Sequence, residues 1–304
     1  TGEKTVLAQL SPGLDNCTFV GDRLFVSSIS GQINEIVAPG EVRPLIPDGM
    51  QWPMGLAIDN DGTLFIADGG FTYTLRVGEQ PQLIGMLFSP GFPGFTRGVL
   101  SSGPGEWIVT TANGDVARYR PADQASEVLA SGFEQAMDIA MAPGGALIFS
   151  EYESGRVLMV KSGNTETIAT GLEKPIGVAV ASDGACYISE SASGRIVQIS
   201  GGKVDTALDG LGQPEGLVIH NEKLYIVDTG SKEVIEYDLK THSRTAIASN
   251  LPVGAPPGIV RKQLGAVGNM SGPMTSFTGI TAGADGTIYV AGDADGSVLA
   301  LRPQ

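Results

Sequence analysis

A short alternating segment recurs along this chain at nearly constant spacing. Each copy runs from a turn into a β-like stretch such as Thr63–Asp68 (TLFIAD) or Lys223–Asp228 (KLYIVD). The second residues of the seven copies are Leu24, Leu64, Trp107, Leu147, Cys186, Leu224 and Ile288. Their separations are 40, 43, 40, 39, 38 and 64 residues. A period near 40 residues with several short strands in each copy is typical of a repeat fold.

Each copy divides into four strand-like segments separated by turns. In the fifth copy these are Ile176–Val180, Ala185–Ser189, Gly194–Ile199 and Lys203–Leu208. The Asp183-Gly184 pair between the first two suits a tight hairpin, and turns of this kind explain why Gly reaches 43 of 304 residues. Four antiparallel strands repeated seven times predict an all-β, seven-bladed β-propeller. A six-bladed propeller with one copy misread is the alternative.

The two chain ends suggest how the predicted propeller closes. The last copy stops at Arg302 after its third strand, while Thr5–Leu10 precedes the first copy without a blade of its own. We expect this N-terminal strand to complete the last blade and so protect its open edge. Residues 1–304 are then a single propeller domain.

Charge and hydropathy limit the partners. Lys and Arg total 19 against 33 Asp and Glu, which gives a net charge of −14. Nucleic acids and anionic membranes need a basic surface, so neither is expected as a partner. No run of 18 apolar residues exists, so no transmembrane helix is expected. We expect a monomer that acts on a small molecule; the cytoplasm is favoured, with a removed signal peptide as the alternative.

Two columns of residues are predicted to face the channel mouth. The first column precedes the first strand's opening glycine or its counterpart: Asn16, Met54, Arg97, Met137, Ile176, Glu215 and Thr278. The second column closes the second strand: Ser28, Asp68, Thr111, Glu151, Glu190, Asp228 and Gly292. The first column is half polar and half apolar, which suits an amphipathic organic ligand.

Four charged column residues are the catalytic candidates. Arg97 is the only cation of the first column, and a buried cation needs a carboxylate or an anionic ligand. Glu215 is the only carboxylate of the same column, and Glu190 and Asp228 join it from the second column. The structural alternative is that second-column carboxylates bind backbone N–H groups of a nearby turn. Asp138 stands where most copies have glycine, which indicates either strain or a site.

Loops on the same face are expected to form an apolar rim. The 64-residue interval contains an insertion, Leu251–Pro273, which we interpret as a lid over the channel because long loops without a repeat pattern are often functional. The apolar loop residues expected to bind substrate are Trp52, Phe88, Phe92, Phe95, Tyr152, Met270 and Phe277. The alternative is that these side chains only pack the loops together.

The segment Pro53–Asp68 (PMGLAIDNDGTLFIAD) resembles an NHL repeat, and Lys174–Arg195 and Gln213–Asp228 repeat the pattern. The chain is similar to the superfamily that holds the SMP-30/gluconolactonase/luciferin-regenerating proteins, the strictosidine-synthase-like proteins and the virginiamycin B lyases. Related lactonases hold a divalent cation through Glu, Asn and Asp of the first column. Here only Glu215 and Asn16 match in type. We expect no required cofactor, with a calcium ion on Glu215, Glu190 and Asp228 as the alternative.

Histidine adds a second test of the resemblance. A lyase of the virginiamycin B type would need a histidine at the channel mouth. His220 and His242 are predicted to lie at the opposite face, because one ends a first strand and the other follows a third strand. Acid–base chemistry would then fall to carboxylates, Tyr or groups polarised by Arg.

Two classes of function remain. The first is a small-molecule enzyme, hydrolase/lactonase-like or lyase/cyclase, acting on a hydrophobic substrate in the channel. In it, Arg97 polarises a carbonyl or binds a carboxylate, and Glu215 moves a proton. The second is a non-catalytic propeller that binds a ligand or a protein.

Overall fold

The computed structural model describes residues 2–11, 13–47, 49–256, 258–259, 262–263, 265–266, 272, 275 and 277–303. The chain divides into two compact units, Thr1–Gln51 and Trp52–Gln304, and each is described by itself. Helical structure in the described ranges is limited to one 3₁₀ turn, η1 (Pro121–Asp123). None of the described helices is long and apolar enough to cross a membrane.

The first unit is one four-stranded antiparallel sheet. Its strands are β1 (Leu14–Val20), β2 (Arg23–Ser28), β3 (Ile33–Ala38) and β4 (Glu41–Ile46), paired in that order. All seven residues of β1 are exposed. Glu35 of β3 is buried and forms ion pairs with Arg23 and Arg43, whose hydrogen bonds lower the pKa of Glu35 to about 2.

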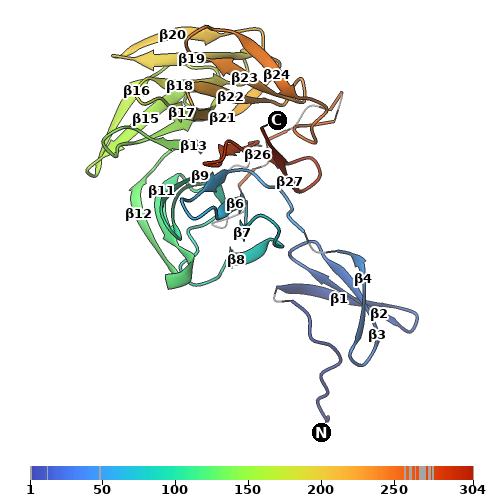
Figure 1. The fold of residues 1–304 in the computed structure, drawn as a ribbon. Coiled ribbons are helices and arrows are strands. Elements are labelled where there is room, and N and C mark those ends of the chain that lie inside the picture. Colours follow the sequence, from blue (N-terminus) through green and yellow to red (C-terminus); the bar gives the residue numbers. More distant parts are fainter. Residues whose placement is uncertain are drawn as a thin grey trace. The chain divides into compact units, whose positions relative to one another are not determined.

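The second unit contains six antiparallel sheets (Figure 1). In sheet order the strands are β5 (Leu56–Ile58), β6 (Leu64–Asp68), β7 (Phe71–Leu75), β8 (Gln82–Met86); β9 (Thr96–Gly103), β10 (Glu106–Thr111), β11 (Asp115–Arg120), β12 (Ala125–Ser131); β13 (Ala136–Met141), β14 (Leu147–Glu151), β15 (Arg156–Lys161), β16 (Asn164–Ala169); β17 (Pro175–Val180), β18 (Cys186–Glu190), β19 (Arg195–Ser200), β20 (Lys203–Leu208); β21 (Pro214–His220), β22 (Lys223–Asp228), β23 (Glu233–Asp238), β24 (Arg244–Ala248); and β25 (Ile280–Ala282), β26 (Ile288–Gly292), β27 (Ser297–Leu301).

The seven sheets, one for each sequence copy, confirm the predicted all-β, seven-bladed repeat, and no copy is misread. The last sheet has three strands, β25–β26–β27, among the described residues. The expected closure of this sheet by an N-terminal strand is wrong for the described structure, because Thr5–Leu10 forms no strand. The carbonyl of Leu7 instead accepts a 2.7 Å hydrogen bond from Gly40, in the turn between β3 and β4.

The innermost strands of the second unit contact one another in a closed cycle. The order is β5, β9, β13, β17, β21, β25 and back to β5. Glycine makes this approach possible: a Cβ on Gly177 would lie 2.1 Å from the carbonyl oxygen of Glu215, and one on Gly279 would lie 2.2 Å from that of Met54. Neither residue has a positive φ, so glycine is needed here for close approach and not for a turn.

Hydroxyl side chains of the second strands tie these inner strands together. Ser189 Oγ accepts a 2.7 Å hydrogen bond from the Gly177 N–H and donates a 2.6 Å bond to the Glu215 carbonyl. Thr110 bridges Gly98 and Met137 in the same way. Each hydroxyl therefore satisfies one buried donor and one buried acceptor on two neighbouring sheets. Apolar clusters fill the spaces between sheets, as with Ile148, Val157, Val178 and Ile188.

Candidate functional site

The first-column residues of the second unit form the mouth of the channel. Each exposes 2% or less of its surface: Met54, Arg97, Met137, Ile176, Glu215 and Thr278. Asn16, the remaining column residue, belongs to β1 in the first unit. It is exposed, and its Oδ1 accepts a 2.8 Å hydrogen bond from the Cys17 N–H.

The apolar half of the mouth is a packed cluster. Met54, Met137, Ile176 and Phe277 form one buried hydrophobic cluster. A partly buried rim packs against it: Trp52, Phe95 and Tyr152. The rings of Trp52 and Phe95 meet edge to face at 6.4 Å between centroids. The structure thus brings most of the predicted substrate-binding residues into one place.

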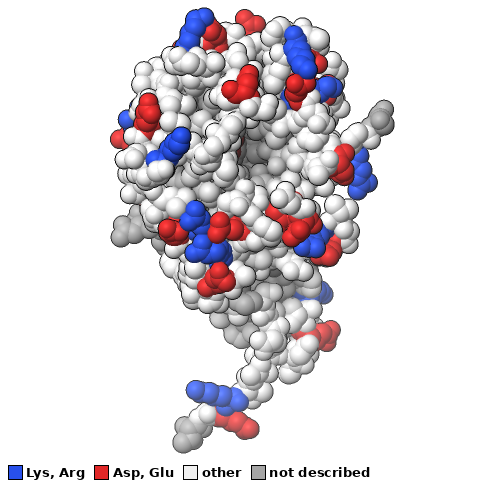
Figure 2. Space-filling view, turned by 60° about the vertical axis from the view of Figure 1, so that its left-hand side comes forward, with Lys and Arg blue, Asp and Glu red and all other residues white. Residues whose placement is uncertain are grey.

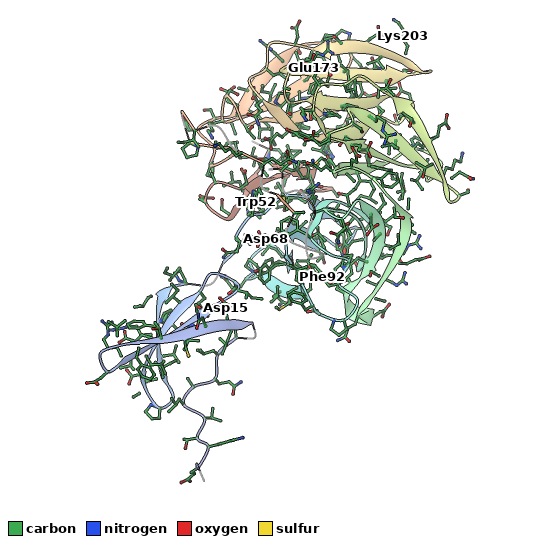
Figure 3. All side chains as sticks on the ribbon, turned by 180° about the vertical axis from the view of Figure 1, so that it is seen from behind. Asp15, Trp52, Asp68, Phe92, Glu173 and Lys203 are labelled. Atoms are coloured by element: carbon green, nitrogen blue, oxygen red, sulfur yellow. The ribbon has the colours of Figure 1, made fainter. Side chains whose placement is uncertain are left out.

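Three predicted rim residues are not part of this cluster. Phe88 is 80% exposed. Phe92 packs on Tyr119, 6.0 Å between ring centroids, in the core between the β5–β8 and β9–β12 sheets (Figure 3). Met270 and nine other residues of the expected lid lie outside the described residues. Loop sequence alone did not separate side chains that pack between sheets from those that face the mouth.

Among the described residues, the side chains of Gln213 and Thr229 and the backbone N–H of Thr278 donate hydrogen bonds to Glu215. Its Oε1 accepts hydrogen bonds from Gln213 Nε2 and Thr229 Oγ1, both at 3.1 Å. Its Oε2 accepts the Thr278 N–H at 2.7 Å. These bonds come from two neighbouring sheets and fix the carboxylate in one orientation. Gln213 and Thr229 were missed by sequence reasoning, although both are polar, Gln213 lies two residues before Glu215 and Thr229 directly follows Asp228.

Arg97 is the cation of the mouth. Its Nη1 donates to the Ala136 carbonyl at 3.4 Å and contacts the Met137 sulfur at 3.6 Å. Burial lowers the pKa of Arg97 to about 10, so the guanidinium stays charged at neutral pH. Arg97 lies on β9 and Glu215 on β21, which are three strands apart in a cycle of six. The two charges therefore belong to opposite sides of the channel.

The second-column carboxylates bind the loop that leads into the inner strand. Glu190 accepts the Glu173 N–H at 2.6 Å and forms an ion pair with Arg195. Asp228 accepts the N–H groups of Gly212 and Gln213, each at 2.7 Å. Asp68 similarly accepts the N–H of Trp52, which lies next to it in Figure 3. Asp228 thereby positions Gln213, one of the donors to Glu215.

Tyr152 links the rim to the charged side of the mouth. Burial raises the pKa of its hydroxyl, and the negative charges of Glu153 and Glu215 raise it further. The ammonium of Lys174 lies 4.7 Å from the centroid of the Tyr152 ring and also pairs with Glu153 at 2.7 Å. Tyr152 thus keeps its proton at neutral pH and remains a hydrogen-bond donor.

Asp138 occupies a second position in the channel. It lines a central cavity of about 280 Å³ formed by the inner strands, and it is the only ionisable side chain among the described lining residues. Its two oxygens accept the N–H groups of Ile139 at 2.9 Å and Val178 at 3.0 Å. Burial outweighs these bonds and raises the pKa of Asp138 to about 7. Asp138 stands where most copies have glycine, and its side chain joins β13 to β17.

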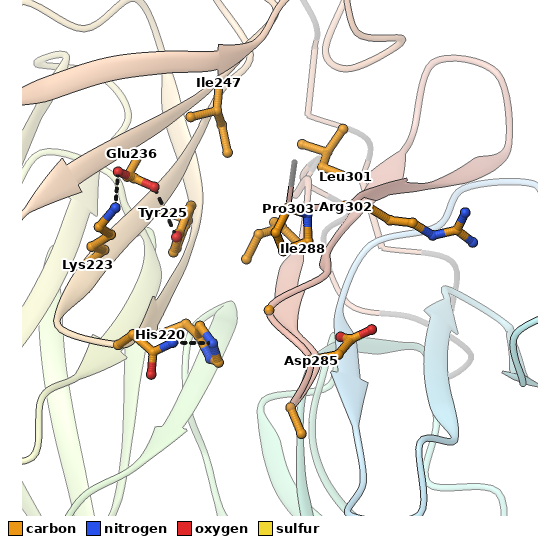
Figure 4. A pocket seen from close by; sticks show the side chains of 13 residues that line it. His220, Lys223, Tyr225, Glu236, Ile247, Asp285, Ile288, Leu301, Arg302 and Pro303 are labelled. Atoms are coloured by element: carbon orange, nitrogen blue, oxygen red, sulfur yellow. Dashed lines mark hydrogen bonds and ion pairs between the residues drawn. The ribbon is translucent and has the colours of Figure 1, made fainter.

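The two histidines lie elsewhere. His220 ends β21, the strand that Glu215 begins, and lines a groove of about 640 Å³ with residues of β22, β23 and the last sheet (Figure 4). In this groove Lys223 pairs with Glu236 at 2.5 Å, and Tyr225 donates to Glu236 at 3.1 Å. His242 Nδ1 bonds the Tyr237 hydroxyl at 2.8 Å. Neither imidazole reaches the mouth.

Within the described residues, no group of three or more His, Cys, Asp and Glu side chains is arranged to hold a metal ion. The charged side chains on the face shown in Figure 2 are mixed in sign.

Comparison with known proteins gives likenesses of structure only. No family model matches the sequence, and no curated protein matches it. A gluconolactonase from Xanthomonas campestris is similar with a TM-score of 0.61 at 14% identity, over 90% of this chain and 88% of that one. A catalytically inactive virginiamycin B lyase from Staphylococcus aureus, solved with quinupristin, has a TM-score of 0.57 at 16% identity, over 93% and 92%. A calcium-binding regucalcin from Agrobacterium tumefaciens has a TM-score of 0.59 at 16% identity, over 80% and 82%.

The chain has a β-propeller fold, and in this it is similar to these solved structures. Identities this low establish the fold and nothing about chemistry, because one fold hosts many activities.

Proposed function

We propose that the protein is a small-molecule enzyme that acts on a hydrophobic organic substrate at the channel mouth. The observation that carries this proposal is that two fully buried opposite charges, Glu215 and Arg97, lie at the same mouth as a buried apolar cluster with an aromatic rim. Buried charge is costly and is concentrated at functional sites.

In the proposed reaction, Arg97 polarises a carbonyl of the substrate and stabilises the negative charge that develops on its oxygen. Glu215 takes a proton from an attacking water, or from the substrate itself, and returns it to the leaving oxygen. Lactone hydrolysis is the version supported by the likeness to a gluconolactonase. A lyase or cyclase is the other version, supported by the likeness to virginiamycin B lyase.

The histidine positions favour the hydrolytic version for this chain. Neither His220 nor His242 lies at the mouth, so a proton transfer there falls to Glu215, with Tyr152 as a neighbouring donor. Glu190 and Asp228, also predicted as catalytic, are proposed to act through position, because their oxygens bind backbone groups of the loop and, for Glu190, Arg195. We further propose a monomer that needs no cofactor and binds neither nucleic acid nor membrane.

Turnover of a substrate panel tests the proposal. The panel holds gluconolactone, aryl and long-chain lactones, and quinupristin, and it is run on wild type, Glu215→Gln and Arg97→Met. Each substitution should lower kcat by about 10²–10⁴-fold on any substrate that is turned over. Glu166→Gln, which changes an exposed glutamate on β16, is the matched control and should retain the wild-type rate.

Equal rates for Glu215→Gln and wild type would remove Glu215 from the mechanism. If no panel member is turned over but one binds, the non-catalytic ligand-binding propeller becomes the better description. Elemental analysis by inductively coupled plasma, run on the same sample, would overturn the cofactor-free version if it found stoichiometric calcium.

A further inference from the structure

The apolar half of the mouth holds an aromatic side chain that comes from outside the inner strands. Phe277 precedes β25, exposes 1% of its surface and belongs to one buried apolar cluster with Met54, Met137 and Ile176. These three residues come from or directly precede inner strands of three different sheets, β5, β13 and β17. A cluster that joins them spans the channel, because β5 does not neighbour β13 or β17 in the cycle. Phe277 therefore fills part of the apolar half of the proposed site.

A long-range hydrogen bond secures the segment that carries Phe277. Thr275 Oγ1 donates to Gln135 Oε1 at 2.8 Å, and both residues are buried. Gln135 lies before β13 and is 140 residues away in sequence from Thr275. Gln135 also has a positive φ of 59°, which is unfavourable for a residue with a side chain. Thr275, two residues before Phe277, is thus held to the residue that precedes β13.

The hydroxyl of Thr278, next to Phe277 in sequence, indicates which group a ligand would supply. Thr278 is fully buried, and its Oγ1 has no hydrogen-bond partner among the described residues. Its own N–H donates to Glu215. A buried hydroxyl without a partner costs about 1–3 kcal/mol. A polar group of a ligand beside Glu215 would remove this cost.

We propose that Phe277 is a plug that occupies the apolar subsite in place of the ligand, and that the Thr275–Gln135 bond holds it there. The ligand class follows from the plug: an aromatic or similarly sized apolar group joined to a polar group that bonds Thr278. This inference rests on the proposed function for the location of the site, but the plug exists whether or not catalysis occurs.

Oxidation of methionine tests the plug without an activity assay. The full chain is given a short pulse of hydrogen peroxide, and sulfoxide at each methionine is measured by peptide mass spectrometry. Met54 and Met137 expose 0% of their surfaces and belong to the same cluster as Phe277, whereas Met141 is 43% exposed and serves as the internal reference. In wild type, Met54 and Met137 should oxidise far more slowly than Met141.

Phe277→Ala and Gln135→Ala should each raise oxidation of Met54 and Met137 several-fold, with Met141 unchanged. Gln124→Ala is the matched control, since it alters another glutamine at positive φ that lies at the end of η1. Toluene, which has the size of the lost side chain, should restore protection in Phe277→Ala because apolar cavities bind such molecules. Gln135→Ala keeps the test valid if Phe277→Ala does not fold.

Unchanged oxidation in both folded variants would overturn the plug. Raised oxidation that toluene does not reverse would overturn the ligand class and leave the plug standing. Neither result depends on turnover, so failure of the catalytic proposal is seen separately, in the Glu215→Gln assay.

Discussion

The residue that opens the inner strand differs between the first unit and the second, and the difference shows what that position does. In the first sheet it is Cys17, which is exposed on an exposed strand. In the second unit it is glycine or, once, Asp138, and it is buried against the next inner strand. The same repeat sequence forms a four-stranded sheet in both cases. Only the sheets of the cycle need a residue without a side chain, or one that can itself bond the neighbour.

The strongest test of this difference is to replace a glycine of the inner strands with alanine. Gly177→Ala would place a methyl group 2.1 Å from the Glu215 carbonyl oxygen, so β17 and β21 must separate. We expect a loss of about 3 kcal/mol or more in the free energy of unfolding, measured by denaturant titration. Gly103→Ala is the control: it lies at the end of β9 with no atom within 4 Å of the added Cβ, and its effect should be small. A small effect at Gly177 would mean that the cycle is not closely packed.

The second test uses pH. The pKa of Asp138 is raised to about 7 from 3.8, so between these pH values the folded chain holds a proton that the unfolded chain releases. Stability contributed by this site therefore falls as pH rises from about 4 to about 7, by an amount on the order of 3 kcal/mol. The measurement is the difference in unfolding free energy between wild type and Asp138→Asn across this range. A difference that does not change with pH would show that Asp138 is ionised throughout.

The third test compares one serine in each unit. Ser189 and Ser27 hold equivalent places in their second strands, and both hydroxyls reach the carbonyl of a first-column residue. Ser189 is buried and bonds Gly177 and Glu215, whereas the Ser27 bond to Asn16 is 3.4 Å long and exposed. Ser189→Ala should cost about 1–3 kcal/mol because it leaves a backbone N–H without a partner. Ser27→Ala should be nearly neutral, and equal losses would contradict the distinction between the units.

The smallest expected effect lies in the first sheet. Arg23 and Arg43 lower the pKa of Glu35 to about 2 from 4.5, so their contribution is present above pH 4.5 and is lost as pH falls toward 2. Amide hydrogen exchange in β3 should speed up over this range in wild type. Glu35→Gln should exchange at the same rate at both ends of the range once the intrinsic pH dependence is removed. A pH effect that persists in Glu35→Gln would come from another group.

Periodicity was enough to predict the seven sheets, because each copy carries its own strand and turn signals. It also predicted that Glu215, Arg97 and the apolar column residues occupy equivalent positions on the inner strands, where the structure buries them; their catalytic and binding roles stay predictions. Contacts between copies were not predictable. The bonds from Gln213 and Thr229 to Glu215, the place of Phe277 in the apolar cluster and the packing of Phe92 on Tyr119 all depend on tertiary distances. Glycine was assigned to turns, yet Gly177 and Gly279 serve the close approach of strands.

The serine and threonine hydroxyls that bridge the inner strands have a consequence for how the mouth can change in sequence. They bind backbone atoms of the column residues, as Ser189 binds the carbonyl of Glu215, and leave the side chains out of the contact. The bridges from Thr110 to Met137 and from Ser150 to Ile176 therefore do not depend on which side chain these two positions carry. A replacement at Met137 or Ile176 changes the packing of the apolar cluster but keeps the backbone bond, which makes these positions the first to randomise in a search for altered substrates.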